Sequence, residues 1–551
     1  MNYLPETTYL LDSHGITATT WMERLAGQAL TISEFDVYKM AEYMPKDATD
    51  GANFIVQNVP GCLSYNGDRK TWFVWNGLVH EPLTSAMVPL QLIDFLGDAI
   101  KDVDIILDTH MAIKAKHIRA DSSLTDAEKK TAITAMRGPI VQARKAWSKF
   151  AISLHSNKGV KDVLDKLTRI VSKSKTHFEN DRDWLVVKNG VIDIPAYRST
   201  GVVNLMGHSA LRPVTRYLDA DFDQKADAPV WKGFLSSSIV DDGGDTVKLL
   251  QKAVGAAFSA EAKPRALFNL LGAPASGKSV FLSVFNRLGQ GYSVMPNNQA
   301  IQSNNGDTNF YQDDLRGKRF VGFSEVQGKK PLDDGFLKGV IGGDEQNTRK
   351  MREMAEPWTP QCVLFIASNM ALKFNTRDEA TFIKILPIPF PHSFTDVDPE
   401  RQMDRELENK VLAERSGILN WVLEGMTEFW KLGLAPTAAV LDAMNGNKTA
   451  NSHALQFMEA MMEERHLTQD NMAPMSGCIS VGTAYDMFRN WAEANGIRNI
   501  TGKQTFADDV ADFYFGKKRS DGARFIGLVM APHLVQNIKN GMSHLNLAKN
   551  L

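Results

Sequence analysis

The chain has 551 residues, more than one hydrophobic core ordinarily accommodates, so we expect roughly three or four domains. Its composition is that of a soluble globular protein, and the net charge of −2 excludes a whole-chain basic surface, so nucleic acid would have to bind at local patches. The three cysteines are far apart, which argues against disulfides or a cysteine zinc site and fits a reducing cytoplasm. No signal peptide and no apolar run long enough to span a membrane is evident.

The N-terminal region predicts a short extension followed by strands. Residues 1–55 form the extension, with an expected helix at 33–43. Residues 54–79 alternate between apolar and polar types and are rich in aromatic side chains, which predicts short strands with a turn at Asn76 and Gly77.

A basic helical region comes next. Residues 88–178 have a helical pattern with an excess of Lys and Arg, which favours either a solvated helix surface or a collar facing DNA or another subunit. A strand–turn–strand pattern at 184–194 and a polar linker at 219–229 follow. From 230 to 435, apolar strands alternate with helices, as expected for a nucleotide-binding core.

A glycine-rich loop within this core predicts phosphate binding. A buried strand at 265–271 runs into the sequence GAPASGKS, and 280–285 continue as a helix, which is the context this loop requires. Its glycines allow backbone N–H groups to turn toward phosphate oxygens, and the helix N-terminus adds positive potential. We expect Lys278 to reach the β- and γ-phosphates and Ser279 to ligate Mg²⁺. The predicted triphosphate-binding residues are Gly272, Ala273, Pro274, Ala275, Ser276, Gly277, Lys278, Ser279 and Val280.

Two further strands end in polar residues suited to hydrolysis. Glu325 ends a short apolar strand and is the expected carboxylate that orients and deprotonates water, although an ordinary strand-end Glu is the alternative. The predicted Mg²⁺ ligands are Ser279 and Glu325. Many such motors carry two adjacent acids at this strand end, but here Ser324 precedes Glu325, so the alternative is that Ser279 alone, aided by water, binds Mg²⁺ directly. Asn369 ends the next buried strand, either as a hydrogen-bonding partner of the γ-phosphate or the water, or as a turn former.

The ordered motifs LGAPASGKS, GKRFVGFSE, LKGVIGGDEQNTRKMRE, FIASN and ILPIPF resemble those of superfamily 3 helicases. More narrowly, they are similar to phage and plasmid primase-helicases related to the poxvirus primase-helicase, as are the upstream segments WLVVKNGVIDI and ADAPVWKGFL. The resemblance implies an AAA+-type motor, usually hexameric, that hydrolyses ATP at subunit interfaces and moves along single-stranded DNA, typically 3′ to 5′. Since only some 55 residues precede the family-like region, we expect no primase domain.

The resemblance also implies roles for basic residues. Residues 337–350 correspond to a hairpin that projects into the central channel, where cations grip the DNA backbone; a surface basic cluster is the alternative. The family's trans-acting arginine is replaced by Lys384, which lacks the guanidinium fork, and Arg377 is the other candidate for that role. The predicted catalytic residues are Lys278, Glu325, Asn369, Lys384 and Arg377. The predicted DNA contacts in this segment are Lys338, Arg349 and Lys350; for Lys338, pairing with a local acid is the alternative.

The C-terminal region, beyond an expected linker at 433–447, predicts a separate α+β unit. Helical patterns at 481–492 and 504–513 precede a basic turn between short strands, and this order is similar to a winged helix. Acidic residues on the second helix argue against close groove entry, so a protein-interaction wing is the alternative. The residues expected to contact DNA phosphates are Lys517, Lys518, Arg519 and Arg524.

Taken together, the predicted fold is α/β: an AAA+-type superfamily 3 core with a mixed α+β N-terminal region and a C-terminal winged-helix domain. The expected parts are 1–55, an oligomerisation region at 56–228, the ATPase at 229–440 and the winged helix at 450–540. The predicted function is an ATP- and Mg²⁺-dependent replicative DNA helicase of a phage or mobile element, acting on single-stranded and forked DNA in the bacterial host cytoplasm. Expected partners are further copies of the chain in a homohexamer and other replication proteins, with no membrane. An ATP-regulated replication initiator with little unwinding is the alternative.

Overall fold

The computed structural model describes the greater part of the chain and divides it into two compact units. These are Met1–Gln224 with Gly289–Tyr292, and Lys225–Leu288 with Ser293–Leu551. None of the described helices has both the length and the apolar character needed to cross a membrane. The described residues are 11–12, 15–16, 45–58, 61–67, 70–83, 93, 108, 111–174, 177–178, 181–260, 265–303, 310–326, 331–348, 356–374, 383–396, 398–399, 401–470, 472–497, 500–513, 517–518, 523–532 and 534–535.

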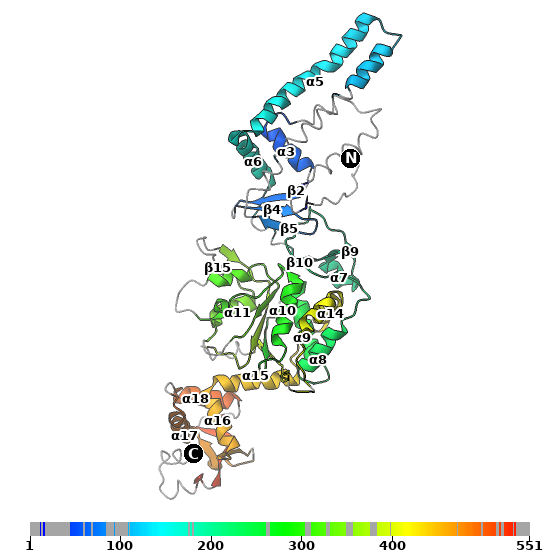
Figure 1. Cartoon of the computed structure of the whole chain (residues 1–551). Coiled ribbons are helices and arrows are strands. Elements are labelled where there is room, and N and C mark those ends of the chain that lie inside the picture. The colour runs from blue at the N-terminus through cyan, green and yellow to red at the C-terminus, as the bar shows by residue number, and fades with distance from the viewer. Residues whose placement is uncertain are drawn as a thin grey trace. The chain divides into compact units, whose positions relative to one another are not determined.

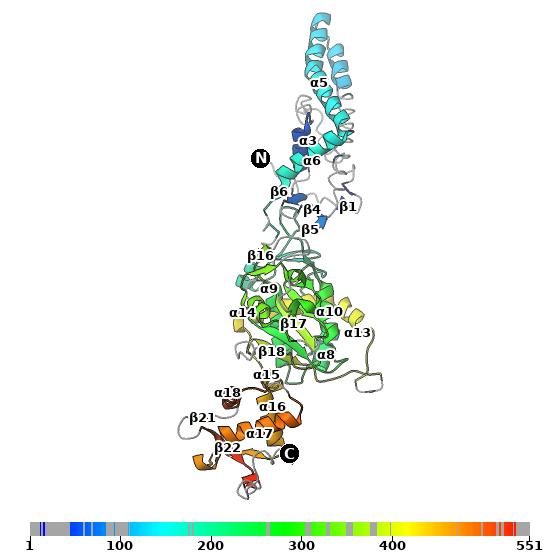
Figure 2. The ribbon, with the colours of Figure 1, turned by 90° about the vertical axis from the view of Figure 1, so that its left-hand side faces the viewer.

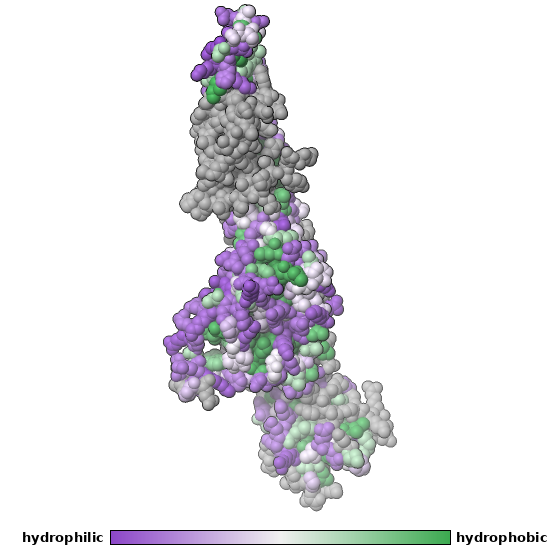
Figure 3. Space-filling view, turned by 90° about the vertical axis from the view of Figure 1, so that its right-hand side faces the viewer, coloured by the Kyte–Doolittle hydropathy of each residue, from purple (hydrophilic) through white to green (hydrophobic). Residues whose placement is uncertain are grey.

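The first unit contains two larger sheets and a helical hairpin. The sheets have the strand orders β5-β4-β3-β6 and β12-β10-β7-β8-β9, and β1 pairs with β2. Thr125 and Glu128 form a reciprocal capping box at the start of α5, beside a helix over residues 111–120 (Figure 1). The end of this hairpin is largely hydrophilic (Figure 3). The elements are β1 (Leu11–Asp12), β2 (Gly15–Ile16), α3 (Ala48–Asn58), β3 (Leu63–Asn66), β4 (Thr71–Trp75), β5 (His80–Leu83), α5 (Asp126–Leu154), α6 (Asn157–Val171), β6 (Ser172–Lys173), β7 (Trp184–Val187), β8 (Gly190–Asp193), α7 (Ile194–Thr200), β9 (Leu205–Met206), β10 (Tyr217–Leu218) and β12 (Gly289–Gln290).

The core of the first unit lies where α3, α5 and α6 meet. Trp147 of α5, Leu167 of α6 and Ile55 of α3 are each no more than 2% exposed and belong to one apolar cluster. The predicted strand is therefore wrong at residues 54–58, which lie in α3, where Phe54 and Ile55 are buried. The expected helix at 33–43 falls outside the described residues.

Other N-terminal predictions are confirmed. Asn76 and Gly77 lie between β4 and β5, and the Asn76 side chain accepts hydrogen bonds from the N–H groups of Leu78 and Val79. The pattern at 184–194 forms the antiparallel pair β7–β8.

The second unit is built on a parallel sheet with the order β13-β14-β17-β11-β18. Strands β14 and β17 are buried along their whole length, because helices cover both faces of the sheet. In Figure 1, α9, α10 and α14 lie on one side and α11 on the other, while Figure 2 shows β17 near the centre. The elements of this part are α8 (Pro229–Ser238), α9 (Asp245–Ser259), β11 (Leu267–Leu271), α10 (Lys278–Leu288), β13 (Ser293–Val294), η1 (Asn298–Ile301), η2 (Phe310–Leu315), β14 (Phe320–Phe323), α11 (Asp334–Gly342), β15 (Gln346–Thr348), β16 (Glu356–Trp358), β17 (Val363–Ser368), β18 (Ile385–Pro389), α13 (Leu407–Ala413) and α14 (Arg415–Leu432).

An aromatic core covers one face of this sheet. The ring centroids of Phe320 and Phe365 lie 4.4 Å apart, and Phe281 of α10 stacks on Trp231 of α8 at 5.8 Å. The opposite face forms a separate apolar cluster with α11. The predicted strands at 265–271, 319–325 and 362–369 and the predicted helix at 280–285 are confirmed.

Helices α9 and α14 cross at two glycines. A Cβ on Gly255 would lie 2.1 Å from the Met426 nitrogen, and one on Gly425 would lie 2.2 Å from the Gln251 oxygen. Since real Cβ atoms do not approach backbone so closely, this crossing requires glycine on both helices.

The C-terminal part of the second unit has its own core. Strands β19, β22 and β20 pair in that order, β21 pairs with β22, and Phe457, Phe488 and Phe506 lie among the buried residues. The helices predicted at 481–492 and 504–513 are confirmed. The linker predicted at 433–447 is wrong over most of its length, because a helix begins after the N-cap Thr437. The elements are α15 (Ala438–Asn451), α16 (His453–Glu463), β19 (Leu467–Gln469), η3 (Met475–Gly477), β20 (Cys478–Ser480), α17 (Val481–Ala494), α18 (Lys503–Phe513), β21 (Lys517–Lys518) and β22 (Arg524–Met530).

Candidate phosphate-binding site

The glycine-rich loop connects β11 to α10 and adopts a backbone that few residues tolerate. Ala275 and Gly277 have φ values of 58° and 93°. A Cβ on Gly272 would lie 2.0 Å from the Phe390 oxygen, and one on Gly277 would lie 2.7 Å from the Phe234 ring. Both glycines are thus required by close packing, in agreement with the expected turn.

Lys278 lies at the start of α10 and points back into the loop. Its side-chain nitrogen donates to Gly272 O at 2.7 Å, Ala273 O at 2.6 Å and Ser276 Oγ at 2.9 Å. Burial lowers the pKa of the Lys278 ammonium from its ordinary value. Ser279 is exposed in the first turn of the helix. The ammonium and the hydroxyl are therefore both at the loop, as the sequence predicts.

A segment that follows β18 holds the outer side of the loop. The Phe390 N–H donates to Leu271 O at 2.7 Å, and the Phe394 N–H donates to Ala275 O at 2.9 Å. The Ser393 hydroxyl donates to Pro274 O at 3.0 Å. Sequence reasoning missed this support, because the last motif ended at Phe390 and gave no sign of contacts about 120 residues back along the chain.

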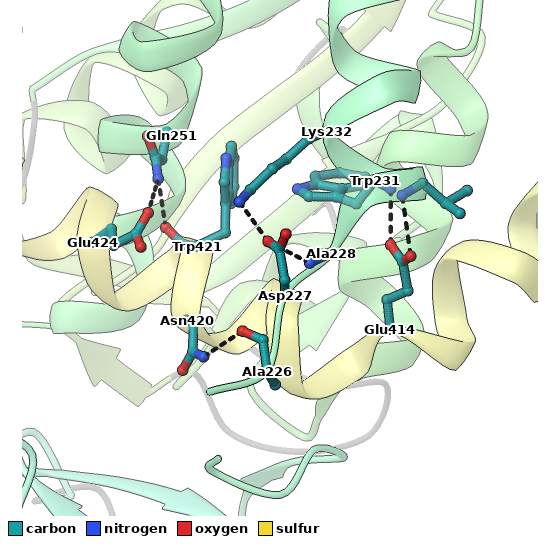
Figure 4. A network of polar contacts seen from close by, with 11 residues as sticks. Ala226, Asp227, Ala228, Trp231, Lys232, Gln251, Glu414, Asn420, Trp421 and Glu424 are labelled. Carbon is teal, nitrogen blue, oxygen red and sulfur yellow. Dashed lines mark hydrogen bonds and ion pairs between the residues drawn. The ribbon is translucent and has the colours of Figure 1, made fainter. Parts of the chain in front are cut away.

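Helix α8 packs against the loop on another side. Phe234 and Ser238 are the residues that a Cβ on Gly277 would meet. The N-cap of α8, Ala228, forms no side-chain cap, but the Glu414 carboxylate accepts the N–H groups of Val230 and Trp231, both at 3.0 Å (Figure 4). A residue far along the chain therefore caps a helix that supports the phosphate loop.

Glu414 lies between α13 and α14, and this α13–α14 segment also contacts helix α10. Glu408 accepts from the Ser283 hydroxyl at 2.7 Å and forms an ion pair with Arg287 at 3.0 Å. The two glutamates, Glu408 and Glu414, thus tie this segment to both helices that flank the loop.

Glu325 follows β14 in a strained conformation. Its φ is 53°, and its side chain is exposed. The backbone is fixed on both sides: Ser324 O accepts from Asn298 Nδ2 at 2.8 Å, and the Val326 N–H donates to Ala367 O at 3.0 Å. This left-handed turn directs the chain across the end of the neighbouring strand β17.

Three motifs meet at the carboxyl edge of the sheet. Leu271 is in register with Ser368, and Phe323 is in register with Ile366, so the three parallel strands end at similar levels. The Gly272 N–H donates to Ser368 O at 3.2 Å, and the exposed Asn369 follows directly. The structure therefore brings together the glycine loop, Glu325 and Asn369, as the spacing of the motifs predicts.

Lys384 lies at the opposite edge. Its carbonyl oxygen accepts from the Leu267 N–H at 2.8 Å, where β11 and β18 begin. The five residues of β11 separate it from the loop by about 16 Å at 3.3 Å per residue. Lys384 is therefore not part of the loop site of its own chain. Arg377 lies outside the described residues.

The predicted channel hairpin differs from the structure. Residues 337–342 belong to helix α11, which ends at Gly343 with φ of 82°, and the hairpin is formed by β15 and β16. Lys338 therefore lies on a helix. Arg349 and Lys350 fall between the two strands and outside the described residues.

A buried polar network ties down the base of this hairpin. Thr348 Oγ1 donates to Asp313 Oδ1 at 2.7 Å and accepts from Trp358 Nε1 at 2.8 Å, while Arg316 pairs with the same carboxylate at 3.1 Å. Each of Thr348, Asp313 and Trp358 is at most 7% exposed. Buried groups satisfied in this way fix a single geometry.

Of the C-terminal residues predicted to bind DNA, only Arg524 has a described side chain. It donates to the Cys478 carbonyl on β20, so it is engaged within its own sheet. Lys517 and Lys518 form β21, and their side chains lie outside the described part of the structure, as does all of Arg519. Among the described residues, no three His, Cys, Asp or Glu side chains are grouped so as to hold a metal ion.

Comparison with known families gives matches over two parts of the chain. Residues 52–239 match the family described as "D5 N terminal like". This match relates residues 52–239 to the N-terminal region of primase-helicases. Residues 270–381, which contain the glycine loop, Glu325 and Asn369, match a family of unknown function (DUF5906). The chain matches no curated protein sequence.

Three solved structures of the NrS-1 C-terminal region are similar to this chain, all at low identity. "The apo structure of NrS-1 C terminal region (305-718)" is 12% identical and covers 62% of this chain and 92% of its own, with a TM-score of 0.33. Two A form apo structures of the region are 13% and 11% identical, cover 56% and 60% of this chain and 77% and 93% of their own, and have TM-scores of 0.32 and 0.36. Likenesses with such TM-scores carry no weight for the site or the function of this chain.

Proposed function

We propose that the chain is an ATP-dependent replicative DNA helicase of a phage or mobile element, with an AAA+-type core of superfamily 3. The observation that carries this proposal is the convergence of the glycine loop, Glu325 and Asn369 at one edge of a parallel sheet. A phosphate cradle beside an exposed carboxylate and an amide is the set of groups that hydrolysis of a nucleoside triphosphate needs.

The residues at the loop fit a triphosphate with Mg²⁺. The left-handed positions at Ala275 and Gly277 suit a loop whose N–H groups face an anion, and the Lys278 ammonium already lies against that loop. The Ser279 hydroxyl and the Glu325 carboxylate would hold Mg²⁺, which binds one or two protein oxygens besides phosphates and water. When bound, Mg²⁺ supplies positive charge to the β- and γ-phosphates.

The roles of the protein groups follow from where they lie. Lys278 would neutralise the transferred phosphate, and Glu325 would orient and deprotonate the attacking water. Asn369 would donate from its amide to the γ-phosphate or the water. Burial lowers the pKa of Lys278 and so favours its uncharged form. Binding of a polyanion would raise this pKa again, so that the ammonium would be charged in the bound state.

A second copy of the chain is expected to complete this site. Because Lys384 is remote from the loop of its own chain, it can contact a γ-phosphate only from a neighbouring subunit. This arrangement supports a ring, for which the family resemblance favours a homohexamer. Arg377 remains the alternative trans-acting residue.

DNA is expected to bind at the β15–β16 hairpin and in the C-terminal part. We propose that Arg349 and Lys350, between the two strands, contact the phosphates of single-stranded DNA, with Lys338 on α11 nearby in sequence. We also propose an ATPase domain at 229–440 and a winged-helix domain at 450–540 whose hairpin residues Lys517, Lys518 and Arg519 contact duplex or forked DNA. The expected location is the cytoplasm of a bacterial host, with other replication proteins.

Strand displacement on forked DNA tests the proposal. The wild-type chain is expected to separate strands only with ATP and Mg²⁺, Lys278→Ala to lose nucleotide binding or turnover, and Glu325→Gln to bind ATP without turning it over. Hydrolysis without any strand separation would support the replication initiator instead. Normal turnover by Glu325→Gln would remove that residue from its role.

A further inference from the structure

A polar pair lies inside the sheet directly below the candidate site. Asn269, in the middle of β11, is 0% exposed and is in register with Ile366 and Pro387 on the two adjacent strands. Ser368 at the end of β17 is 1% exposed, and its hydroxyl donates to Asn269 Oδ1 at 2.8 Å. This pair connects the strand that precedes the phosphate loop to the strand that Asn369 follows.

Packing does not account for the pair. The Asn269 Nδ2 atom is buried and has no hydrogen-bond partner among the described residues, although a buried amide donor without a partner destabilises the folded state. Leucine at this position would have nearly the same shape and no polar atoms, and the surrounding side chains on this face, such as Leu267 and Ile366, are apolar. The fold would therefore be at least as stable if both the amide and its hydroxyl partner Ser368 were replaced by apolar groups.

Ser368 occupies a junction between all three motifs. Its carbonyl accepts the Gly272 N–H at 3.2 Å, and the preceding residue, Ala367, accepts the Val326 N–H at 3.0 Å. The side-chain bond to Asn269 adds a third attachment at this point. The backbone from which Asn369 departs is thus held against both the glycine loop and the turn that carries Glu325.

We propose that Asn269 is a positioning residue for triphosphate hydrolysis. Acting through Ser368, it fixes the end of β17 relative to β11, so that the Asn369 amide is held at a set distance from the phosphates in the loop. This inference rests on the proposed function. Asn269 itself contacts no nucleotide, and its contribution is to the geometry of the reacting groups.

Paired measurements of turnover and stability test the proposal. The full-length variants Asn269→Leu, Ser368→Ala and their combination are expected to lower kcat for ATP by about 10- to 100-fold, the effect of a small misplacement of reacting groups, with little change in KM. The thermal unfolding midpoint of the combined variant, which removes both polar partners, is expected to equal or exceed that of the wild type, whereas either single replacement leaves a buried polar atom without its partner and is expected to lower it. Ser368→Thr keeps the hydroxyl and is expected to retain kcat.

The matched control is Ser259→Ala. That hydroxyl is also 0% exposed, but it donates within α9 to Ala256 O at 3.0 Å, so its loss should leave kcat unchanged. Wild-type kcat in the double variant would overturn the positioning role while leaving the proposed function intact. In the same double variant, a fall in kcat that accompanies a lower unfolding midpoint would overturn it as well, by indicating a purely structural pair. Failure of the wild type to hydrolyse ATP would overturn both.

Discussion

Glu414 offers a strong test of how the phosphate loop is supported. Its two carboxylate oxygens accept the N–H groups of Val230 and Trp231 at 3.0 Å each, at the start of a helix without a cap of its own (Figure 4). In Glu414→Ala both acceptors are lost. Loss of a helix cap costs about 0.5–2 kcal/mol, and removal of a negative charge from a helix N-terminus about 0.3–1 kcal/mol. We therefore expect a destabilisation of about 2 kcal/mol.

The assay combines thermal unfolding with amide hydrogen exchange. At about 2–4 °C per kcal/mol for a domain of this size, the unfolding midpoint of the second unit should fall by several degrees. Amides in the first turn of α8 should exchange faster, and KM for ATP should rise, because α8 packs against Gly277. Glu414→Gln keeps one acceptor oxygen, so its loss of stability should be roughly half that of Glu414→Ala.

Glu424→Ala is the matched control for Glu414→Ala. Glu424 lies on the same segment, in α14, but it is exposed, and among the described residues it accepts a hydrogen bond from the Gln251 side chain at 3.3 Å rather than from a helix N-terminus. Its replacement should change stability by no more than about 0.5 kcal/mol. If the two alanine variants had equal unfolding midpoints and equal amide exchange in the first turn of α8, the Glu414 cap would not be what connects this segment to the loop.

Three further predictions concern other parts of the structure. In chemical denaturation, Gly255→Ala should destabilise the second unit by about 3 kcal/mol, because the new methyl group meets the α14 backbone. Gly233→Ala on α8 is the control: a Cβ there meets nothing within 4 Å, so this variant should be neutral or stabilising. Thr348→Val should lower the free energy of unfolding by about 1–3 kcal/mol, because it removes the buried hydroxyl that bonds to Asp313 and Trp358. It should also reduce the stimulation of ATP turnover by single-stranded DNA and leave basal turnover unchanged. Unchanged stimulation would count against anchoring of the hairpin through Asp313. Burial lowers the pKa of His80 from 6.5, so the folded state keeps the ring neutral while the unfolded state takes up a proton as pH falls. The stability of the first unit should therefore be complete above pH 6.5 and decline below it toward the folded-state pKa, and His80→Gln should remove this part of the pH dependence in unfolding measured across pH.

Local sequence determined the elements that carry chemistry. The glycine loop, the strand before it and the helix after it are specified by neighbouring residues, since glycine spacing and apolar runs act over a few positions. The same holds for Glu325 and Asn369, each placed by the end of a buried strand. It holds also for helices α17 and α18, whose apolar spacing is regular.

Local patterns failed where two signals competed. Residues 433–447 contain Pro, Gly and Asn, which favour a linker, but Thr437 caps a helix and Val440 is fully buried in it. Residues 54–58 continue an aromatic and alternating pattern that favours a strand, but they lie in helix α3, whose residues Phe54 and Ile55 are buried in the first core. In both cases tertiary burial outweighed local propensity.

Only the tertiary structure decided what surrounds the loop. The cap from Glu414 joins residues 184 positions apart, and the bond between Asn269 and Ser368 joins residues 99 positions apart. The position of Lys384 at the far edge depends on the parallel pairing of β18 with β11. Sequence spacing specifies none of these, because strand order and helix packing follow from burial of the whole apolar surface at once. The sequence alone thus determined the glycine loop and the strand ends that carry Glu325 and Asn369, and the fold determined how these groups are held and placed Lys384 away from the loop of its own chain.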